Sequence, residues 1–335
     1  MKQYQLTHGG GIDDLLLEER EILRPGPHEV LVRMRAASLN YRDLLIVTGR
    51  YPRNQQNSIV PLSDGAGEIV EVGTHVTRWR ATDRVAGIFM QSWLHGTMRD
   101  GDGDSALGGS RDGVLCEYRL FDEQCVVALP AHLSFEEGAC LPCAAVTAWH
   151  ALVGADPVQV GQRVLILGTG GVATIALQLA CAAGAETIVT SSSDAKLAQM
   201  RELGATHLIN YTKTPEWAQR VRHLSDGLGV DHVLENGGGG TIAQSIAATR
   251  RGGQIYLIGV IAPGAIDPIH ILLASVTVRG IEVGSRAMFE DLNRALSVQQ
   301  IRPVIHQVFD FANTKTAYRA FERGEHVGKI VIRIP

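Results

Sequence analysis

The run Val164-Leu165-Ile166-Leu167-Gly168-Thr169-Gly170-Gly171-Val172-Ala173 decides the fold of this chain. A short apolar run ends at a glycine turn, and helix-forming residues continue without a break up to Ala183. This order of strand, turn and helix is typical of the dinucleotide fingerprint G-x-G-x-x-G/A, with Ala173 as its third small residue. Gly168 would permit the tight turn, and Gly170 would leave room for a pyrophosphate beside the positive end of the helix dipole.

Two other interpretations of this run are open. No charged residue falls between Arg163 and Glu186, so the composition also allows a membrane span. The three glycines near its start, and the change from strand-like to helix-like residues, argue against a span. The second alternative is an ordinary strand–helix unit with a glycine-rich turn, because one G-x-G-x-x-A motif is weak by itself. Motif and context together favour nucleotide binding.

The end of the next strand, residues 187–190, is where a nucleotide unit reads the ribose. NAD-binding units usually place an Asp or Glu there to bond the 2′-hydroxyl. This chain has small hydroxyls and a lysine, which leave room for a 2′-phosphate and attract it. Asp194 is either the missing acid, displaced by a few residues, or part of the cap of the following helix. The pattern favours NADP over NAD, with predicted contacts at Ser191, Ser192, Ser193 and Lys196.

Length and composition limit the class of protein. A chain of 335 residues is long for one core and suits two domains. Its 45% hydrophobic and 20% charged residues are ordinary for a globular enzyme. The net charge of −4, without any basic run, argues against a nucleic-acid partner. The N-terminal residues lack the apolar core of a signal peptide, so we expect a cytoplasmic protein with no membrane partner.

Five cysteines, an odd number at irregular spacing, do not describe a disulfide framework. Cys140 and Cys143 form a C-x-x-C pair, which would allow redox chemistry, but there is no second pair to complete a zinc site. The apolar run that follows them favours buried thiols that behave as small hydrophobic residues.

The pattern of hydrophobic residues changes along the chain. Residues 29–36, 67–73, 83–88 and 114–118 alternate with period two between Gly, Pro and Asp turns, which predicts a small antiparallel, barrel-like domain. Residues 99–112, rich in Gly and Asp, are expected to form a polar loop. From about residue 135 strand and helix patterns alternate, which predicts a doubly wound parallel sheet. The α/β chain would thus comprise one domain of residues 1–134 and 287–335, and a dinucleotide-binding domain of residues 135–286.

Motifs spread over the chain point to one family. They are Ala37-Ser38-Leu39-Asn40-Tyr41-Arg42-Asp43, Thr48-Gly49-Arg50-Tyr51-Pro52, Ser63-Asp64-Gly65-Ala66-Gly67-Glu68, Leu141-Pro142-Cys143-Ala144-Ala145-Val146-Thr147-Ala148-Trp149, Gly168-Thr169-Gly170-Gly171-Val172 and Gly328-Lys329. On these residues the chain resembles, essentially end to end, the medium-chain dehydrogenase/reductase superfamily and its zinc-independent, quinone-oxidoreductase-like branch. The resemblance implies a GroES-like antiparallel β-barrel domain joined to a Rossmann domain.

The departures from this family concern its metal. In zinc members a cysteine falls where Asn40 stands and a Gly-His-Glu run where Leu62-Ser63-Asp64 stands, while the third ligand matches Cys143. A catalytic zinc needs three good protein ligands, and only Asp64 and Cys143 remain, so we expect no zinc. The loop 99–112 also lacks the four cysteines that would hold a structural zinc. Arg42 and Leu45 stand at the positions of the family's proton relay, which is expected to be absent.

Without a metal, hydrogen-bond donors or orientation must activate the substrate oxygen. The resemblance places Asn40 and Tyr51 at the nicotinamide end, where an amide and a phenol can donate. Two alternatives stay open: Tyr51 as an amphipathic rim residue before Pro52, and Asn40 as the cap of a local turn.

The resemblance also adds contacts to the cofactor. Thr147 would lie near the nicotinamide, Tyr211 would join Lys196 at the 2′-phosphate, and Lys329 would reach the cofactor from the closing segment. The full predicted set comprises Asn40, Thr147, Gly168, Thr169, Gly170, Gly171, Val172, Ser191, Ser192, Ser193, Lys196, Tyr211, Asn236, Ile258, Gly259, Val260, Ser285, Arg286 and Lys329. Each of these has the alternative role of a surface or turn residue, and Asn236 is a polar departure from the expected apolar residue.

The sequence therefore predicts an NADP(H)-dependent, metal-free oxidoreductase acting on a small carbonyl, enone or quinone held between the two domains. An NAD(P)-dependent dehydrogenase of simple alcohols is one alternative. A structural or sensing protein that binds NADPH with negligible turnover is another, favoured by the missing relay. The resemblance further implies a homodimer formed through the edge of the nucleotide sheet.

Overall fold

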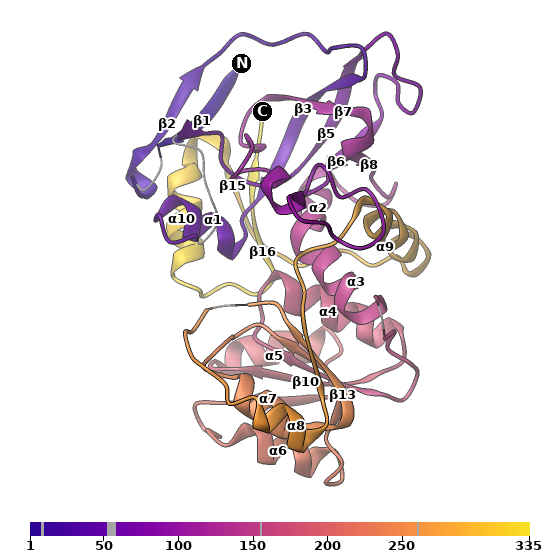
Figure 1. Cartoon of the computed structure of the whole chain (residues 1–335). Helices are drawn as coiled ribbons and strands as arrows, with labels where there is room; N and C mark the ends of the chain where they lie inside the picture. The colour runs from indigo at the N-terminus through magenta and orange to yellow at the C-terminus, as the bar shows by residue number, and fades with distance from the viewer. Residues whose placement is uncertain (8–9, 52–57, 155, 260) are drawn as a thin grey trace. The chain divides into compact units, whose positions relative to one another are not determined.

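The computed structural model describes residues 1–7, 10–51, 58–154, 156–259 and 261–335. The chain divides into two compact units, the first formed by Met1–Val146 with Val283–Pro335 and the second by Thr147–Glu282 (Figure 1). The boundaries differ from the expected 134/135 and 286/287. Residues just before Val146 belong to the first unit because hydrogen bonds tie them to its strands, as when Ser38 Oγ donates to the Ala139 carbonyl over 2.8 Å. Residues after Val283 join it in the same way, since Arg286 N donates to the Trp93 carbonyl over 3.0 Å.

The first unit is built on a seven-stranded sheet. Neighbouring strands are antiparallel except for β15 and β16, which run parallel. β7 also pairs with β3, so β3 has three partner strands: β16, β5 and β7. In spatial order the strands are β15 (Ile305–Asp310), β16 (Lys329–Arg333), β3 (Glu29–Ser38), β5 (Asp64–Val72), β6 (Arg84–Gly87) and β8 (Val126–Ala128), with β7 (Tyr118–Asp122) outside this path.

The expected strand over 114–118 is wrong, because β7 begins only at Tyr118. The backbone before it is hydrogen-bonded elsewhere. Gly113 N donates to the Val60 carbonyl and Leu115 N to the Pro61 carbonyl, over 2.6 and 3.2 Å. The sequence analysis also did not predict a three-stranded sheet of β2 (Leu15–Glu19), β1 (Lys2–Thr7) and β4 (Ser58–Ile59).

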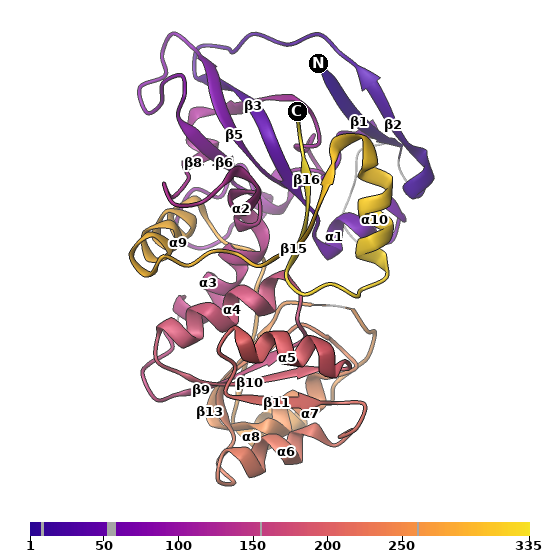
Figure 2. The ribbon, with the colours of Figure 1, turned by 180° about the vertical axis from the view of Figure 1, so that it is seen from behind.

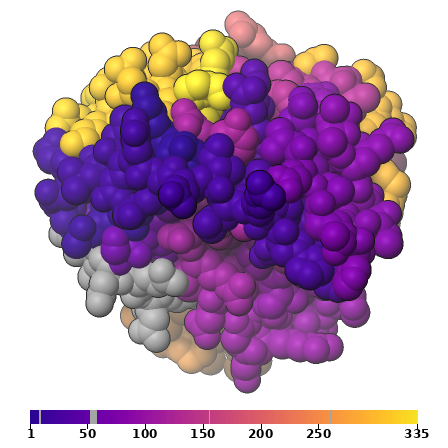
Figure 3. Space-filling model, turned by 90° about the horizontal axis from the view of Figure 1, so that it is seen from above, coloured from indigo at the N-terminus to yellow at the C-terminus, as the bar shows by residue number. Residues whose placement is uncertain are grey.

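The helices of the first unit cover its sheets. α10 (Thr314–Glu322) lies against β15 and β16 and buries Ala317, Tyr318 and Phe321 (Figure 2). α9 (Arg286–Gln299) begins where Ser285 caps it and buries Phe289, Leu292 and Leu296. The remaining helices are α1 (Tyr41–Val47), α2 (Phe135–Gly138) and a π-helical turn at Leu141–Ala145. The face shown in Figure 3 is formed largely by the N-terminal part of the chain.

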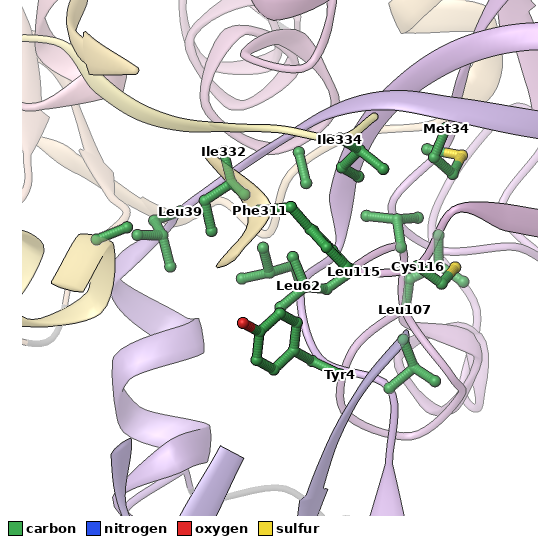
Figure 4. Packing of buried hydrophobic residues seen from close by; sticks show 14 of the residues in the cluster. Tyr4, Met34, Leu39, Leu62, Leu107, Leu115, Cys116, Phe311, Ile332 and Ile334 are labelled. Atoms are coloured by element: carbon green, nitrogen blue, oxygen red, sulfur yellow. The ribbon is translucent and has the colours of Figure 1, made fainter. Parts of the chain in front are cut away.

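One apolar core joins the N-terminal and C-terminal segments of the first unit. Tyr4 meets Phe311 edge-to-face with ring centroids 5.1 Å apart, and Leu115 and Ile332 belong to the same cluster (Figure 4). The segment from 99 to 112 is more than the expected polar loop, since a 3₁₀ turn at Asp102–Ser105 is mostly buried. Asp102 accepts hydrogen bonds from Ser92 Oγ and Arg99 N over 2.6 and 2.7 Å.

The second unit is a six-stranded sheet whose strands are all parallel. Numbered from β9, the strand order is 3-2-1-4-5-6, that of the Rossmann fold. Helices lie on both faces of the sheet (Figures 1 and 2). The strands in spatial order are β11 (His207–Asn210), β10 (Glu186–Ser191), β9 (Arg163–Leu167), β12 (Val230–Glu235), β13 (Thr249–Leu257) and β14 (Thr277–Gly280). The helices are α3 (Val146–Val153), α4 (Gly171–Ala182), α5 (Asp194–Glu202), α6 (Trp217–Leu224), α7 (Ile242–Ala248) and α8 (Ile269–Ala274).

The uncharged run between Arg163 and Glu186 forms β9, the glycine turn and α4, as the fingerprint predicts. Within the described ranges, every helix is too short or too polar to cross a bilayer. All five cysteines are free thiols. Cys140 is buried, which raises the pKa of its thiol to about 12, and its Sγ donates to the Glu136 carbonyl over 3.2 Å. This confirms the interpretation of Cys140 as a buried structural thiol.

Candidate active site

The glycine turn joins β9 to α4 at the strand where the sheet order reverses. Gly168 has φ +85°, a conformation that favours glycine, and its N–H donates to the Thr190 carbonyl over 2.9 Å. A Cβ added at Gly168 or Gly170 would meet no atom within 4 Å, so both glycines border open space. α4 begins directly at Gly171, where the first N–H groups of the helix lack helical acceptors. These residues fit a dinucleotide pyrophosphate.

The residues predicted for the 2′-phosphate come together at the ends of β10 and β11. Tyr211 N donates to the Ser191 carbonyl over 3.1 Å, so the two strand ends are adjacent. Ser193 caps α5, and its Oγ accepts from Lys196 N over 3.4 Å. The serine hydroxyls and Lys196 therefore share one strand-to-helix turn.

Asp194 is the first residue of α5 and is bonded to the neighbouring strand end. Its carboxylate accepts from Asn210 Nδ2 over 2.7 Å and from Lys213 Nζ over 2.5 Å. These two hydrogen bonds lower the pKa of Asp194. Sequence reasoning missed Lys213, although it follows β11 much as Lys196 follows β10. The second lysine adds positive charge at this end of the sheet.

Asn236 now has a structural account. Its Nδ2 donates to the Leu167 carbonyl over 2.8 Å, which ties the end of β12 to the residue before the glycine turn. Ile258 N and Gly259 N both donate to the Glu235 carbonyl, over 3.0 and 3.1 Å, so the three predicted positions are neighbours. Val260 lies outside the described residues.

The remaining predicted cofactor contacts divide between the two units. Thr147 is buried in α3, at the start of the second unit. Ser285 and Arg286 belong to the first, where Ser285 Oγ caps α9 by accepting from Met288 N over 3.3 Å. Arg286 Nη1 donates to Gln124 Oε1 over 2.6 Å and to the Gln124 carbonyl over 3.1 Å. Their roles toward a cofactor stay predictions.

In the first unit, the predicted residues Asn40 and Lys329 are bonded to each other. Lys329 Nζ donates to Asn40 Oδ1 over 2.5 Å and to the Leu39 carbonyl over 2.6 Å. Both side chains are buried, Lys329 with 3% exposure. They meet because β16 pairs with β3, a register continued where Leu39 N donates to the Ile330 carbonyl over 3.0 Å.

A buried carboxyl lies behind Asn40 at the start of α1. Asp43 Oδ2 accepts from Asn40 N over 2.8 Å, so Asn40 does begin a helix as its N-terminal cap residue. Burial raises the pKa of Asp43 to about 6, an effect that the neighbouring Arg42 charge opposes.

Tyr51, the second predicted catalytic residue, lies against a guanidinium. The Arg42 group is 5.2 Å from the Tyr51 ring centroid and 4.7 Å from that of Phe89, and its Nη1 donates to the Leu107 carbonyl over 2.6 Å. The sequence analysis noted Arg42 only as a residue at a lost relay position. The structure makes it the ring partner of Tyr51.

The strand order and the glycine turn define a dinucleotide-binding protein of the Rossmann class. Two family models match the chain: the alcohol dehydrogenase GroES-like domain over residues 26–131 and the zinc-binding dehydrogenase domain over residues 171–298.

Similar proteins cover the chain almost completely. A zinc-type alcohol dehydrogenase-like protein of Schizosaccharomyces pombe is 47% identical over 97% of this chain and 96% of its own length. The crystal structure of a putative alcohol dehydrogenase from Sinorhizobium meliloti 1021 is 40% identical, covers 99% of both chains and has a TM-score of 0.90. A quinone oxidoreductase of Pseudomonas syringae pv. tomato is 26% identical over 99% of both chains, with a TM-score of 0.84. The chain belongs to the medium-chain dehydrogenase/reductase superfamily and is an NAD(P)-dependent oxidoreductase.

The residues at the family's zinc position do not fit a zinc ion. Asp64 Oδ1 accepts from Ser63 Oγ over 2.7 Å, and its Oδ2 accepts from Cys143 N over 2.9 Å. Burial, and next the charge of Asp64, raise the pKa of the Cys143 thiol well above its usual range. Zinc binds thiolates, and the described residues contain no group of three His, Cys, Asp or Glu side chains able to hold a metal. The Lys329 ammonium on Asn40 adds positive charge where a cation would have to bind.

Proposed function

We propose that the protein is a zinc-independent, NADPH-dependent reductase of small carbonyl compounds, enones or quinones. The observation that carries this proposal is the Lys329–Asn40 hydrogen bond, which puts an ammonium group at the family's first zinc-ligand position. An ammonium repels a divalent ion and supplies donors in its place. The preference for NADPH is supported by the serine turn with Lys196, and by Lys213 close to it.

Bound NADPH supplies a hydride to the electrophilic carbon, and the substrate oxygen gains the negative charge. The chain's own residues hold that oxygen and return a proton to the product. Asn40 Nδ2 is a buried donor without a hydrogen-bond partner among the described residues, so it can receive the oxygen. The Tyr51 phenol or solvent supplies the proton. The reaction consumes one NADPH and one proton for each substrate reduced.

The test is NADPH oxidation across a panel of aldehydes, ketones, enones and quinones, with metal content measured on the same protein. We expect turnover at substoichiometric zinc and no loss in a chelator. Zinc bound stoichiometrically through Cys143, with activity abolished by a chelator and restored by the metal, would overturn the proposal. NADPH binding without turnover on the whole panel would instead favour the structural or sensing role.

A dehydrogenase of simple alcohols is the second candidate, favoured by relatives that carry that name. A crystal structure described as an NAD-dependent alcohol dehydrogenase is 29% identical over the whole chain, with a TM-score of 0.90. Faster oxidation of simple alcohols with NADP⁺ than reduction of enones and quinones with NADPH would select this candidate.

A further inference from the structure

We propose that Lys329 is a catalytic residue whose ammonium group, together with Asn40 Nδ2, binds and polarises the substrate oxygen in the role that a metal ion has in zinc enzymes. This inference rests on the proposed reductase function and deepens it, because it names the group that activates the substrate. It differs from the expectation that Lys329 contacts the cofactor.

The first step of the argument is the orientation of the Asn40 amide. A lysine ammonium has three donors and no acceptor, so the Asn40 atom 2.5 Å from Nζ must be the oxygen. The other end of the amide is therefore Nδ2. This atom is buried and has no hydrogen-bond partner in the described part of the chain. The bond to Lys329 thus fixes which end of the Asn40 amide carries the donor.

The second step concerns the donors of Lys329 itself. Two of its three N–H groups are used by the Leu39 carbonyl and Asn40 Oδ1. The described residues provide no acceptor for the third, although the side chain is only 3% exposed. A buried donor without a partner costs about 1–3 kcal/mol. Two such donors, joined through one amide group, would be satisfied together by a single ligand oxygen.

The third step is the charge of the surroundings. Burial raises the pKa of Asp43 to about 6 and raises that of the Cys143 thiol, and the charge of Lys329 opposes both shifts, so this charge acts on both groups. Asp43 lies beside Arg42, with its Oδ1 3.8 Å from Arg42 Nη1, and the charges of Asp64 and Lys329 also act on Asp43. Lys329 is the cation that contacts Asn40, so negative charge that develops on an oxygen bound to Asn40 Nδ2 would lie close to a fixed and buried positive charge, which stabilises an oxyanion.

The chemistry balances without a metal. As hydride adds to the carbon of a carbonyl group, the electron pair of the C=O bond moves to oxygen. In an enone or quinone, hydride adds to a carbon of the C=C bond, the electron pair of that bond forms the new double bond, and the C=O pair moves to the enolate or phenolate oxygen. That oxygen accepts hydrogen bonds from Lys329 Nζ and Asn40 Nδ2. Lys329 keeps its proton throughout, and the product oxygen or carbon takes its proton from Tyr51 or solvent.

The test is Lys329→Met, which keeps the length of the side chain and removes charge and donors. We expect kcat to fall about 100- to 1,000-fold, the scale of losing one oxyanion donor, while the Kd for NADPH changes less than about threefold. The loss should be larger for an unactivated ketone than for an electron-poor quinone, which needs less polarisation. Lys315→Met is the matched control, because Lys315 belongs to the same unit, is partly buried and donates to the Asp13 carbonyl over 2.7 Å; it should keep wild-type kcat.

The outcomes separate the two proposals. Normal kcat in Lys329→Met, or a loss explained by weaker NADPH binding alone, overturns this inference and leaves the reductase function in place. Wild-type protein that reduces no substrate removes both.

A second variant covers the case in which Lys329→Met does not fold. Asn40→Asp keeps an oxygen acceptor for Lys329 and abolishes the Nδ2 donor. It should lower kcat at least about tenfold with the NADPH Kd unchanged. Activity within threefold of wild type would contradict the two-donor site.

Discussion

At the scale of single residues, the first prediction concerns the affinity for NADPH and follows from Lys196 and the serines before it. A charge-assisted hydrogen bond from lysine to a 2′-phosphate contributes about 1–3 kcal/mol. Lys196→Ala should therefore weaken NADPH binding by that amount and change NADH binding little, because NADH has no phosphate there. Fluorescence titration with both cofactors measures the difference. An equal loss for NADH and NADPH would remove Lys196 from the phosphate site.

The buried carboxyl of Asp43 should make the free energy of unfolding depend on pH. Its pKa is raised to about 6 in the folded protein from an ordinary 3.8, so the folded state holds the proton more tightly than the unfolded state. The cost of the ionised carboxylate is therefore absent below about pH 4 and grows as pH rises through about 6, to at most about 3 kcal/mol. Asp43→Asn removes this titration while keeping an oxygen to accept from Asn40 N.

The free energy of unfolding of the wild type, measured relative to Asp43→Asn, should thus fall as pH rises from about 4 to about 6 and level off above that range. Urea denaturation of both proteins across this range provides the measurement. Two parallel stability curves would show that Asp43 does not titrate as its buried position indicates.

The positions of residues were predictable wherever neighbours in the sequence are neighbours in space. The serines and Lys196 share one turn and the glycines another, as their order in the sequence predicts, and their contacts with a cofactor stay predictions. The bond between Lys329 and Asn40 joins residues 289 positions apart and depends on the pairing of β16 with β3. No local sequence pattern contains that strand pairing. The sequence analysis therefore assigned a role to each residue separately and did not predict their hydrogen bond.

At the scale of elements, the close packing of Gly259 just after β13 leads to a prediction about stability. A Cβ at Gly259 would lie 1.8 Å from the Asn236 carbonyl oxygen, and Asn236 is itself bonded to Leu167. Gly259→Ala should therefore lower the free energy of unfolding by about 1–3 kcal/mol and weaken NADPH binding, because the displaced Asn236 supports the glycine turn. Gly280, at the end of the adjacent β14, has open space around its Cβ position.

Gly280→Ala is thus the control and, measured on monomers because β14 is also the dimer edge proposed below, should change stability by less than about 0.5 kcal/mol. Thermal and urea denaturation of the two variants provide the comparison. Equal stability of the Gly259 and Gly280 variants would contradict the close approach of Gly259 to Asn236.

Among the helices and strands, those of the second unit agree best with the elements predicted from the sequence. β9 and α4 carry their signal in one continuous run of apolar residues and glycines. In the first unit, residues 114–118 have the strand pattern, yet the N–H groups of Val114 and Leu115 donate to the carbonyls of Pro61 and Leu62 instead of to a neighbouring strand. Tertiary pairing overrode a local preference there, as is common for short strands.

At the scale of the whole molecule, we propose a homodimer formed through β14, the last strand in the order of the second unit's sheet. α8 has no buried residues, and Leu272 and Leu273 on it are 70% and 64% exposed. An edge strand beside exposed leucines is a surface that a second copy of the chain can cover.

Replacing both leucines with glutamate should convert the dimer to monomers, which light scattering coupled to gel filtration can measure. Val298→Glu, at an equally exposed apolar position on α9, should leave the dimer intact. Wild-type protein that is monomeric at micromolar concentration would contradict the proposal.

The order of the chain also has a consequence for biosynthesis. The second unit is inserted within the first, and β16 (Lys329–Arg333) of the first unit follows the second unit in the chain. During translation, the second unit is therefore complete before β16 is synthesised and can pair with β3. The ammonium group of Lys329 therefore reaches Asn40 only after the whole second unit has been translated, so a chain terminated before residue 329 would lack the group that we assign to substrate activation.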